Sequence, residues 1–98
     1  MVITEALQLS DEKPAVLQIK NTEKSNVIAI GLKKDQVLKK HLSPIPALLV
    51  VLKGSIIFEM EGSRTELKEF STFEIPVNVL HEVTGSTESI FLVIKEKS

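Results

Sequence analysis

Short stretches of apolar and β-branched residues, separated by turn-forming residues, recur along the whole chain of 98 residues. They are rich in Val, Ile and Phe, which favour extended strands, whereas helical periodicity is scarce. Many short strands with regularly spaced turns are typical of a β-sandwich or β-barrel. The sequence therefore predicts an all-β fold with about nine strands, at residues 14–20, 26–33, 36–42, 47–54, 55–61, 65–70, 72–76, 80–85 and 88–95.

Glycine and proline mark several of the connections between these strands. Lys53–Gly54 and Glu61–Gly62 are predicted hairpin turns, because glycine accepts positive φ angles. The prolines of residues 43–46 predict a connection without ladder hydrogen bonds. Two conformations fit residues 4–9, either a helical turn capped by Thr4 or an extra strand on a sheet edge.

The length and the hydrophobic content predict one small domain that associates with itself. A chain of 98 residues has room for a single modest core, and we expect one domain over residues 1–98. Its hydrophobic content of 43% is high for so small an interior. We therefore expect a homodimer, in which the apolar segment Val2–Leu9 is the candidate for exchange across the interface.

Charge and cysteine content exclude several classes of function. The 12 Lys and Arg balance 13 Asp and Glu without a basic run, so nucleic acid is not an expected partner. The absence of cysteine excludes disulfides and thiolate metal sites. The N-terminus lacks the regions of a signal peptide, and no apolar run approaches the roughly 20 residues that cross a bilayer. We expect a cytoplasmic protein that does not engage membranes.

The two histidines of the chain lie in separate segments that resemble known motifs. His41 lies in GLKKDQVLKKHLSPIPALLVVLKG, residues 31–54. This segment resembles the first signature motif of the cupin family, a Gly followed by His-x-His, then Glu, then a closing Gly. Lys39 and His41 occupy the positions of the His pair, and Ala47 occupies the position of the Glu.

The segment FSTFEIPVNVLH, residues 70–81, resembles the second cupin motif, which reads Gly, then Pro-x-Gly, then His. Pro76 and His81 match this pattern, while Phe70 and Asn78 stand at the glycine positions. The two segments are most similar to small single-domain cupins with the motifs LKxH and IPxNxxH. The resemblance covers about residues 26–95 and implies a double-stranded β-helix, a cupin or jelly-roll barrel, that is commonly a homodimer.

Strand alternation predicts which side chains share the barrel interior, because residues two apart point to the same face. Val37, Lys39 and His41 are expected to point together, and the cupin motif implies that His41 points inward. We further expect a barrel closed by pairing of its first and last major strands, with an interior formed by Val37, Leu49, Val51, Ile75, Val79 and Val83. The predicted ligand-binding residues are Lys39, His41, His81, Val37, Leu49 and Val79.

Two imidazoles fall short of the three or four protein ligands that a durable transition-metal site needs. We therefore expect no metal, no cofactor and no catalytic residues, and we interpret the chain as a non-catalytic or accessory barrel that binds an unidentified small ligand in its interior. The alternative is a metal-dependent cupin enzyme of oxygenase or isomerase type. In that case His41 and His81 would hold a divalent transition metal, completed by water or by Glu59, Glu61 or Glu74.

Overall fold

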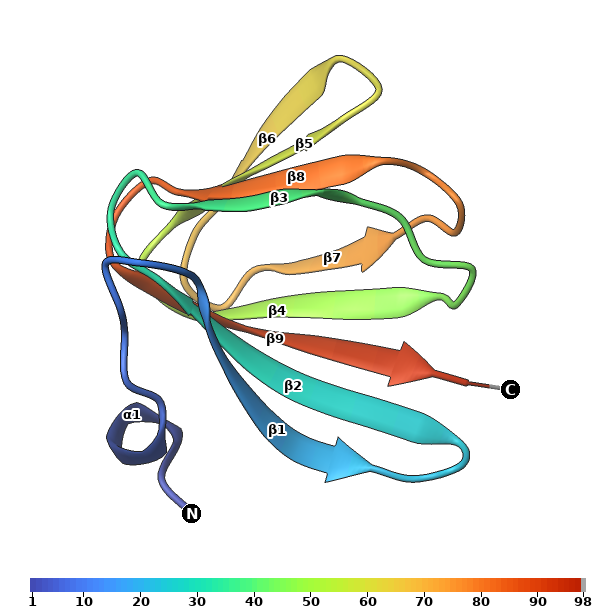
Figure 1. Cartoon of the computed structure of the whole chain (residues 1–98). Coiled ribbons are helices and arrows are strands. Elements are labelled where there is room, and N and C mark those ends of the chain that lie inside the picture. Colours follow the sequence, from blue (N-terminus) through green and yellow to red (C-terminus); the bar gives the residue numbers. More distant parts are fainter. Residues whose placement is uncertain (98) are drawn as a thin grey trace.

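Two antiparallel β-sheets packed face to face form the structure, a computed structural model that describes residues 1–97 (Figure 1). One sheet has the strand order β1-β2-β9-β4-β7 and the other has the order β3-β8-β5-β6. The elements are α1 (Ile3–Ala6), β1 (Ala15–Asn21), β2 (Ser25–Leu32), β3 (Val37–His41), β4 (Ala47–Lys53), β5 (Ile56–Met60), β6 (Ser63–Leu67), β7 (Thr72–Ile75), β8 (His81–Gly85) and β9 (Ser89–Glu96). The predicted all-β fold is confirmed, and every predicted strand segment overlaps one of these strands.

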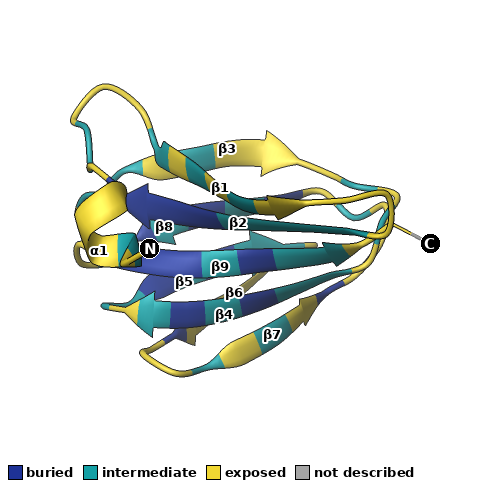
Figure 2. Cartoon of the chain, turned by 90° about the horizontal axis from the view of Figure 1, so that it is seen from below, coloured by how far each residue is buried: buried dark blue, intermediate teal, exposed yellow. Residues whose placement is uncertain are grey.

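The core lies between the two sheets and is formed by the inward-facing half of each strand. Figure 2 shows the buried residues concentrated on the central strands, with exposed residues at the edges. Alternation places the large apolar side chains on one face of each strand, where they exclude water from the space between the sheets. The buried cluster contains Ile30, Leu32, Leu49, Val51, Ile56, Phe58, Leu67, Ile75, Val83, Phe91 and Val93.

Four of the six predicted interior residues are buried, namely Leu49, Val51, Ile75 and Val83. The prediction is wrong for Val37, whose exposed fraction is 37%. It is also wrong for Val79, which lies half-buried in the connection before β8 rather than on a strand.

Strand β2, not β1, is the neighbour of the last strand. Residues Ser25–Leu32 pair with β9 along their whole length, while β1 pairs with β2 and forms the edge of the sheet. The predicted closure by the first and last strands is therefore wrong. Strand β2 is apolar on both faces and suits the middle of a sheet, whereas β1 alternates between half-buried and exposed residues, which suits an edge.

The N-terminal segment forms one helical turn, α1, followed by an extended stretch that lies on the outer face of the five-stranded sheet. The helix begins at Ile3 after Val2 and has no side-chain cap, so the predicted capping by Thr4 is wrong. Leu7 is buried against Ala29 and Ile90 in a second apolar cluster. Gly31 of β2 leaves room for this segment, because a Cβ atom there would meet the side-chain ends of Leu9 and Leu7. In the single chain the segment therefore covers its own sheet, and exchange between protomers stays a prediction.

One of the two predicted hairpin turns is present. Glu61 and Gly62 both have positive φ angles, 48° and 77°, and join β5 to β6 as a two-residue hairpin. The other prediction is wrong, because residues 54–55 lead from β4 in one sheet to β5 in the other. Across residues 1–97, no helix is long and apolar enough to span a membrane.

We expect Leu49→Ala to lower the free energy of unfolding by about 2–4 kcal/mol, because the side chain is fully buried in the main cluster. Leu42→Ala is the matched control, since that leucine is 50% exposed, and it should cost less than about 0.5 kcal/mol. Urea melts of both variants make the comparison. Equal losses would contradict the packing described above.

Candidate functional site

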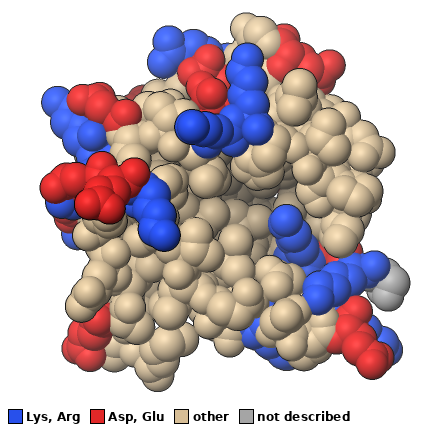
Figure 3. Space-filling model, in the orientation of Figure 1, with Lys and Arg blue, Asp and Glu red and all other residues tan. Residues whose placement is uncertain are grey.

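A small cavity lies between the two sheets near the ends of β3, β4 and β9. Its volume is about 50 Å³, and its polar lining comes from His41, Ser43, His81 and Lys95. The remaining lining is apolar and consists of Ile28, Ile30, Leu38, Ile45, Ala47, Leu49, Ile75, Val83, Phe91 and Val93. Figure 3 shows a recess in the middle of the molecule, with uncharged atoms at its base and Lys or Arg side chains at its margin.

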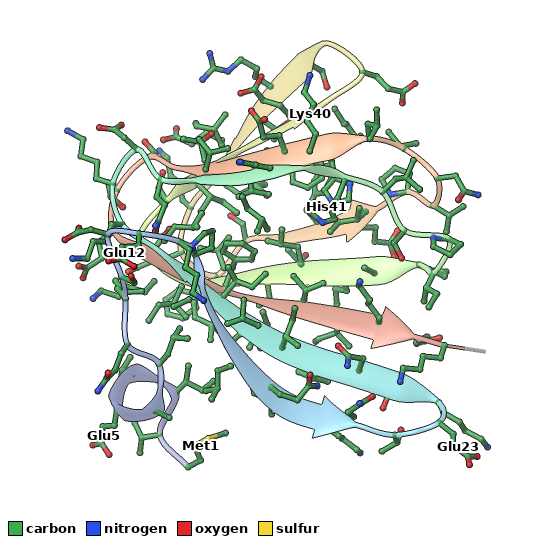
Figure 4. The ribbon with its side chains drawn as sticks, viewed as in Figure 1. Met1, Glu5, Glu12, Glu23, Lys40 and His41 are labelled. Atoms are coloured by element: carbon green, nitrogen blue, oxygen red, sulfur yellow. The ribbon has the colours of Figure 1, made fainter. Side chains whose placement is uncertain are left out.

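A β-bulge in β3 decides which side chains reach this cavity. Leu38 pairs with Val83, and His41 pairs with His81. Between these two pairs β3 has two residues and β8 has only one. Lys39 and Lys40 both fall within this irregularity and are both exposed. Figure 4 shows Lys40 on the outer side of the four-stranded sheet and His41 in the space between the sheets.

The bulge corrects the predicted register of β3. Leu38 and His41 face the cavity, whereas Val37 and Lys39 do not line it. The prediction that Val37, Lys39 and His41 share one inward face is therefore wrong for its first two members, because the extra residue breaks strict alternation. Among the other predicted ligand-binding residues, His41, His81 and Leu49 meet in the cavity, and Val79 does not line it.

Each histidine is oriented by a main-chain carbonyl two residues before it. The Nδ1 atom of His41 lies 2.9 Å from the Lys39 oxygen, and Nδ1 of His81 lies 3.1 Å from the Val79 oxygen. Because a carbonyl oxygen can only accept, both Nδ1 atoms carry a proton and donate it. In the neutral ring the proton-free nitrogen is then Nε2, a hydrogen-bond acceptor.

His81 lines the cavity with its ring. His81 is only 5% exposed, and its Nε2 atom has no hydrogen-bond partner within residues 1–97. Among the described residues 1–97, Ser89 Oγ is the only fully buried side-chain nitrogen or oxygen without a hydrogen-bond partner. His81 Nε2 is therefore not fully enclosed, and the open space beside this residue is the cavity that it lines.

Aromatic contacts hold the His81 ring between the core and His41. The ring stacks on Phe58 with a centroid separation of 5.3 Å and an interplanar angle of 17°. His41 meets it edge to face at 4.3 Å. These contacts leave His81 little rotational freedom, because a stacked ring with a fixed Nδ1 has no other nearby arrangement.

Burial lowers the pKa of His81 from its ordinary value of 6.5, and the nearby charges of His41 and Lys95 lower it further. The hydrogen bond to the Val79 carbonyl opposes this change without cancelling it. His81 is thus neutral at physiological pH, with its Nε2 lone pair available to the cavity.

Lys95 is the site residue that the sequence analysis missed. It is the Cα partner of Ala47 across the β4–β9 ladder and lines the cavity beside that residue. Alternation along β9 carries the signal, because Phe91 and Val93 face the core and Lys95 follows them with the same spacing. Because lysines at strand ends are commonly exposed, the sequence does not single out Lys95 as a residue of the site.

The motif positions are visible in the backbone as well as in the side chains. Phe70 and Asn78, which stand where the second cupin motif has glycine, take φ angles of 66° and 58°. This left-handed region favours glycine, tolerates asparagine and is unusual for phenylalanine. The Phe70 ring is 81% exposed, so the position is set by the backbone and not by packing of the ring. Both positions thus take a backbone conformation that favours glycine, although neither residue is glycine.

The donor set does not fit a transition metal. Within residues 1–97, no group of three or more His, Cys, Asp or Glu side chains could hold a metal ion. Glu59 pairs with Arg64 at 3.8 Å, Glu61 lies in the β5–β6 turn, and Glu74 is exposed on β7. Completion of a site by one of these carboxylates, as the sequence suggested for the alternative, is therefore wrong. His41 and His81 stand beside a lysine instead.

Solved structures that resemble this chain share its whole architecture. An uncharacterized conserved protein with a double-stranded β-helix domain from Klebsiella pneumoniae is 19% identical with a TM-score of 0.90, over 99% of this chain and 83% of that one. An RmlC-like cupin from Desulfovibrio desulfuricans is 21% identical with a TM-score of 0.87, over 95% and 91%. The chain has the cupin fold.

A further cupin superfamily protein, from Desulfitobacterium hafniense, has a TM-score of 0.89 at 9% identity, over 98% of this chain and 88% of that one. No protein-family model and no curated protein matches the sequence. The cupin resemblance seen in the sequence is confirmed at the level of fold. At these identities the neighbours support the arrangement of the barrel, while the chemistry rests on the side chains of this chain.

We expect the free energy of unfolding to fall as the pH drops below about 6.5, in part because of His81. Its pKa is lowered in the folded state, so the unfolded chain binds the proton more readily. The contribution of His81 is complete above 6.5 and is lost as the pH falls through the lowered pKa. NMR titration of the His81 ring should give a midpoint below 6.5, and His81→Gln should show a shallower loss of stability between pH 7 and 5. A midpoint at or above 6.5 would contradict the desolvation argument.

Proposed function

We propose that this cupin is a non-catalytic or accessory barrel that binds a small ligand in its interior. The observation that carries the proposal is the cavity between the sheets, in which His41, His81 and Lys95 converge within an apolar lining. A concave apolar site with a few convergent polar groups is the usual form of a small-molecule site. The polar groups orient a ligand, and the apolar walls exclude water around it.

The size of the cavity limits what it can take. At about 50 Å³ it is far smaller than the roughly 300–1,000 Å³ of sites for drug-sized ligands. A ligand held inside therefore has only a few non-hydrogen atoms, or inserts one end and leaves the rest outside.

The alternative, a metal-dependent oxygenase or isomerase, is less well supported by the donor set. Ala47 presents a methyl group where a carboxylate would serve as a ligand, and Lys95 pairs with this residue across the ladder. An ammonium group beside two imidazoles opposes the entry of a divalent cation. The site accordingly favours ligands that lack positive charge.

We expect the unmodified protein to bind Zn²⁺ only weakly, and the double variant Ala47→Glu, Lys95→Met to bind it at least about tenfold more tightly. The variant adds a carboxylate at the cavity and removes the opposing charge. Isothermal titration with Zn²⁺ measures both proteins. Adding Lys39→His to the variant is the control for the bulge, and it should change little because position 39 is exposed. Equally tight binding by the unmodified protein would favour the metal-dependent alternative.

We also propose that the protein is a homodimer that associates through the outer face of the five-stranded sheet. This face carries half-buried apolar residues, among them Leu48, Val50 and Ile94. A depression of about 570 Å³ lined by Leu48, Ile94 and Val77 adjoins it. Apolar surface of this kind on a small domain is commonly covered by a second subunit.

Val50→Lys should convert the dimer to a monomer, because it places a charge in the middle of the proposed interface. Light scattering at micromolar concentration measures the mass of both proteins. Val16→Lys is the matched control, since Val16 lies on the edge strand β1, is 60% exposed and faces the other side of the sheet. A monomeric unmodified protein would remove the proposal.

A further inference from the structure

We propose that the cavity recognises a small hydroxycarboxylate, whose carboxylate pairs with the Lys95 ammonium and whose hydroxyl donates a hydrogen bond to Nε2 of His81. This inference rests on the proposed function, because it names the chemical class of the ligand that the cavity would bind. Three properties of the cavity carry it: its charge, its free acceptors and its size.

The charge of the cavity calls for an anion. Lys95 is the one lining residue with a permanent charge, and no carboxylate is present among the lining residues. Within residues 1–97, the Lys95 ammonium has no hydrogen bond or ion pair, whereas Lys33 and Lys53 are paired with Asp11 and Glu88. Lys95 is a half-buried residue, and an ammonium without a partner gains most from a negatively charged ligand.

The histidines supply acceptors and not donors. Their Nδ1 protons are held by the carbonyls of Lys39 and Val79, which leaves Nε2 of each neutral ring as an acceptor. The remaining polar lining residue is Ser43, whose hydroxyl accepts from the Ile45 amide at 3.1 Å and donates to the Ile45 carbonyl at 3.4 Å. The cavity therefore offers the Lys95 ammonium as a cationic donor and Nε2 of His81 as an acceptor.

Only a ligand with both functions satisfies this set. A simple carboxylate pairs with Lys95 but turns its lone pairs toward the Nε2 lone pair of His81. A neutral alcohol donates to Nε2 but leaves Lys95 without a counter-charge. A hydroxycarboxylate does both, and a site built for a hydroxyl discriminates strongly against the analogue that lacks it.

The volume sets the scale of the ligand. A cavity of about 50 Å³ accommodates a group the size of glycolate, with Leu38, Ile28 and Ile45 among its apolar walls. A longer hydroxy acid would present the same head group and extend through the opening of the recess. Glycolate and a longer hydroxy acid share the same hydroxycarboxylate head group, and they differ in the length of their carbon chain.

The test is a titration of the full chain at pH 7.5 and constant ionic strength, followed by NMR shifts of residues at the cavity. The probes are glycolate, acetate, which lacks the hydroxyl, and glycolamide, which lacks the charge. We expect glycolate to bind most tightly, with a dissociation constant in the millimolar range because it has so few atoms. Acetate and glycolamide should each bind at least about fivefold more weakly.

Three variants assign the contacts. Lys95→Met should weaken glycolate binding by at least about tenfold and leave glycolamide binding nearly unchanged. Lys39→Met is the matched control and should have no effect, because Lys39 is exposed outside the cavity. His81→Phe retains an aromatic ring against Phe58 and should abolish the preference for glycolate over acetate. If His81→Phe does not fold, Lys95→Met by itself tests whether the ligand carboxylate pairs with the Lys95 ammonium.

The outcomes separate this inference from the proposed function. Binding of glycolamide as tight as that of glycolate, or no effect of Lys95→Met, overturns the inference and leaves a small-ligand site in place. Failure of all three probes to shift cavity residues overturns both. Tighter binding of phosphate than of glycolate also overturns the inference, because it indicates a polyanion site. Glycolate binding that strengthens with chain length, measured with 2-hydroxyhexanoate, supports the inference and identifies the head of a longer acid.

Discussion

Packing of the two inner sheet faces around Phe58 is the interaction on which the rest of the structure depends. Phe58 is fully buried on β5, lies 4.6 Å from the Phe73 ring of the opposite sheet, and stacks on His81. The same side chain thus joins the sheets and supports the site. Because packed interiors transmit small displacements, the position of His81 follows from how tightly the sheets close. The chemistry of the cavity is in this sense a property of the core.

The bulge in β3 is the second constraint, and it acts on charge. Strand β3 is the edge of its sheet, where bulges are common and an extra residue costs few ladder hydrogen bonds. With the extra residue, His41 lines the cavity although it is exposed, whereas Lys39 and Lys40 do not line it. Without it, one of these lysines would share the inner face with the imidazole. The single cation at the cavity comes instead from β9, through Lys95.

The two histidines are oriented as metal-binding imidazoles often are, but the charge beside them is positive. Each imidazole keeps a carbonyl on Nδ1, the arrangement that presents Nε2 to a metal in many proteins. Lys95 lies beside Ala47. An acidic side chain at position 47 would attract a cation, but alanine has no charge. Acceptors together with a fixed positive charge favour an anionic ligand with a donor group over a metal ion. At Phe70 and Asn78 the backbone takes the left-handed conformation that glycine favours, although neither residue is glycine.

The sequence by itself determined the all-β class, the nine strand segments, the cupin resemblance and the inward placement of Leu49, Val83, His41 and His81, because these follow from local alternation and motif spacing. It did not determine the outward placement of Val37 and Lys39, the edge position of β1 or the role of Lys95. A bulge shifts register without changing composition, and strand order depends on which faces pair across the core. Lys95 reaches the site only because β9 lies next to β4, forty-eight residues away from Ala47 in the chain, so the tertiary structure alone decided the charge of the cavity.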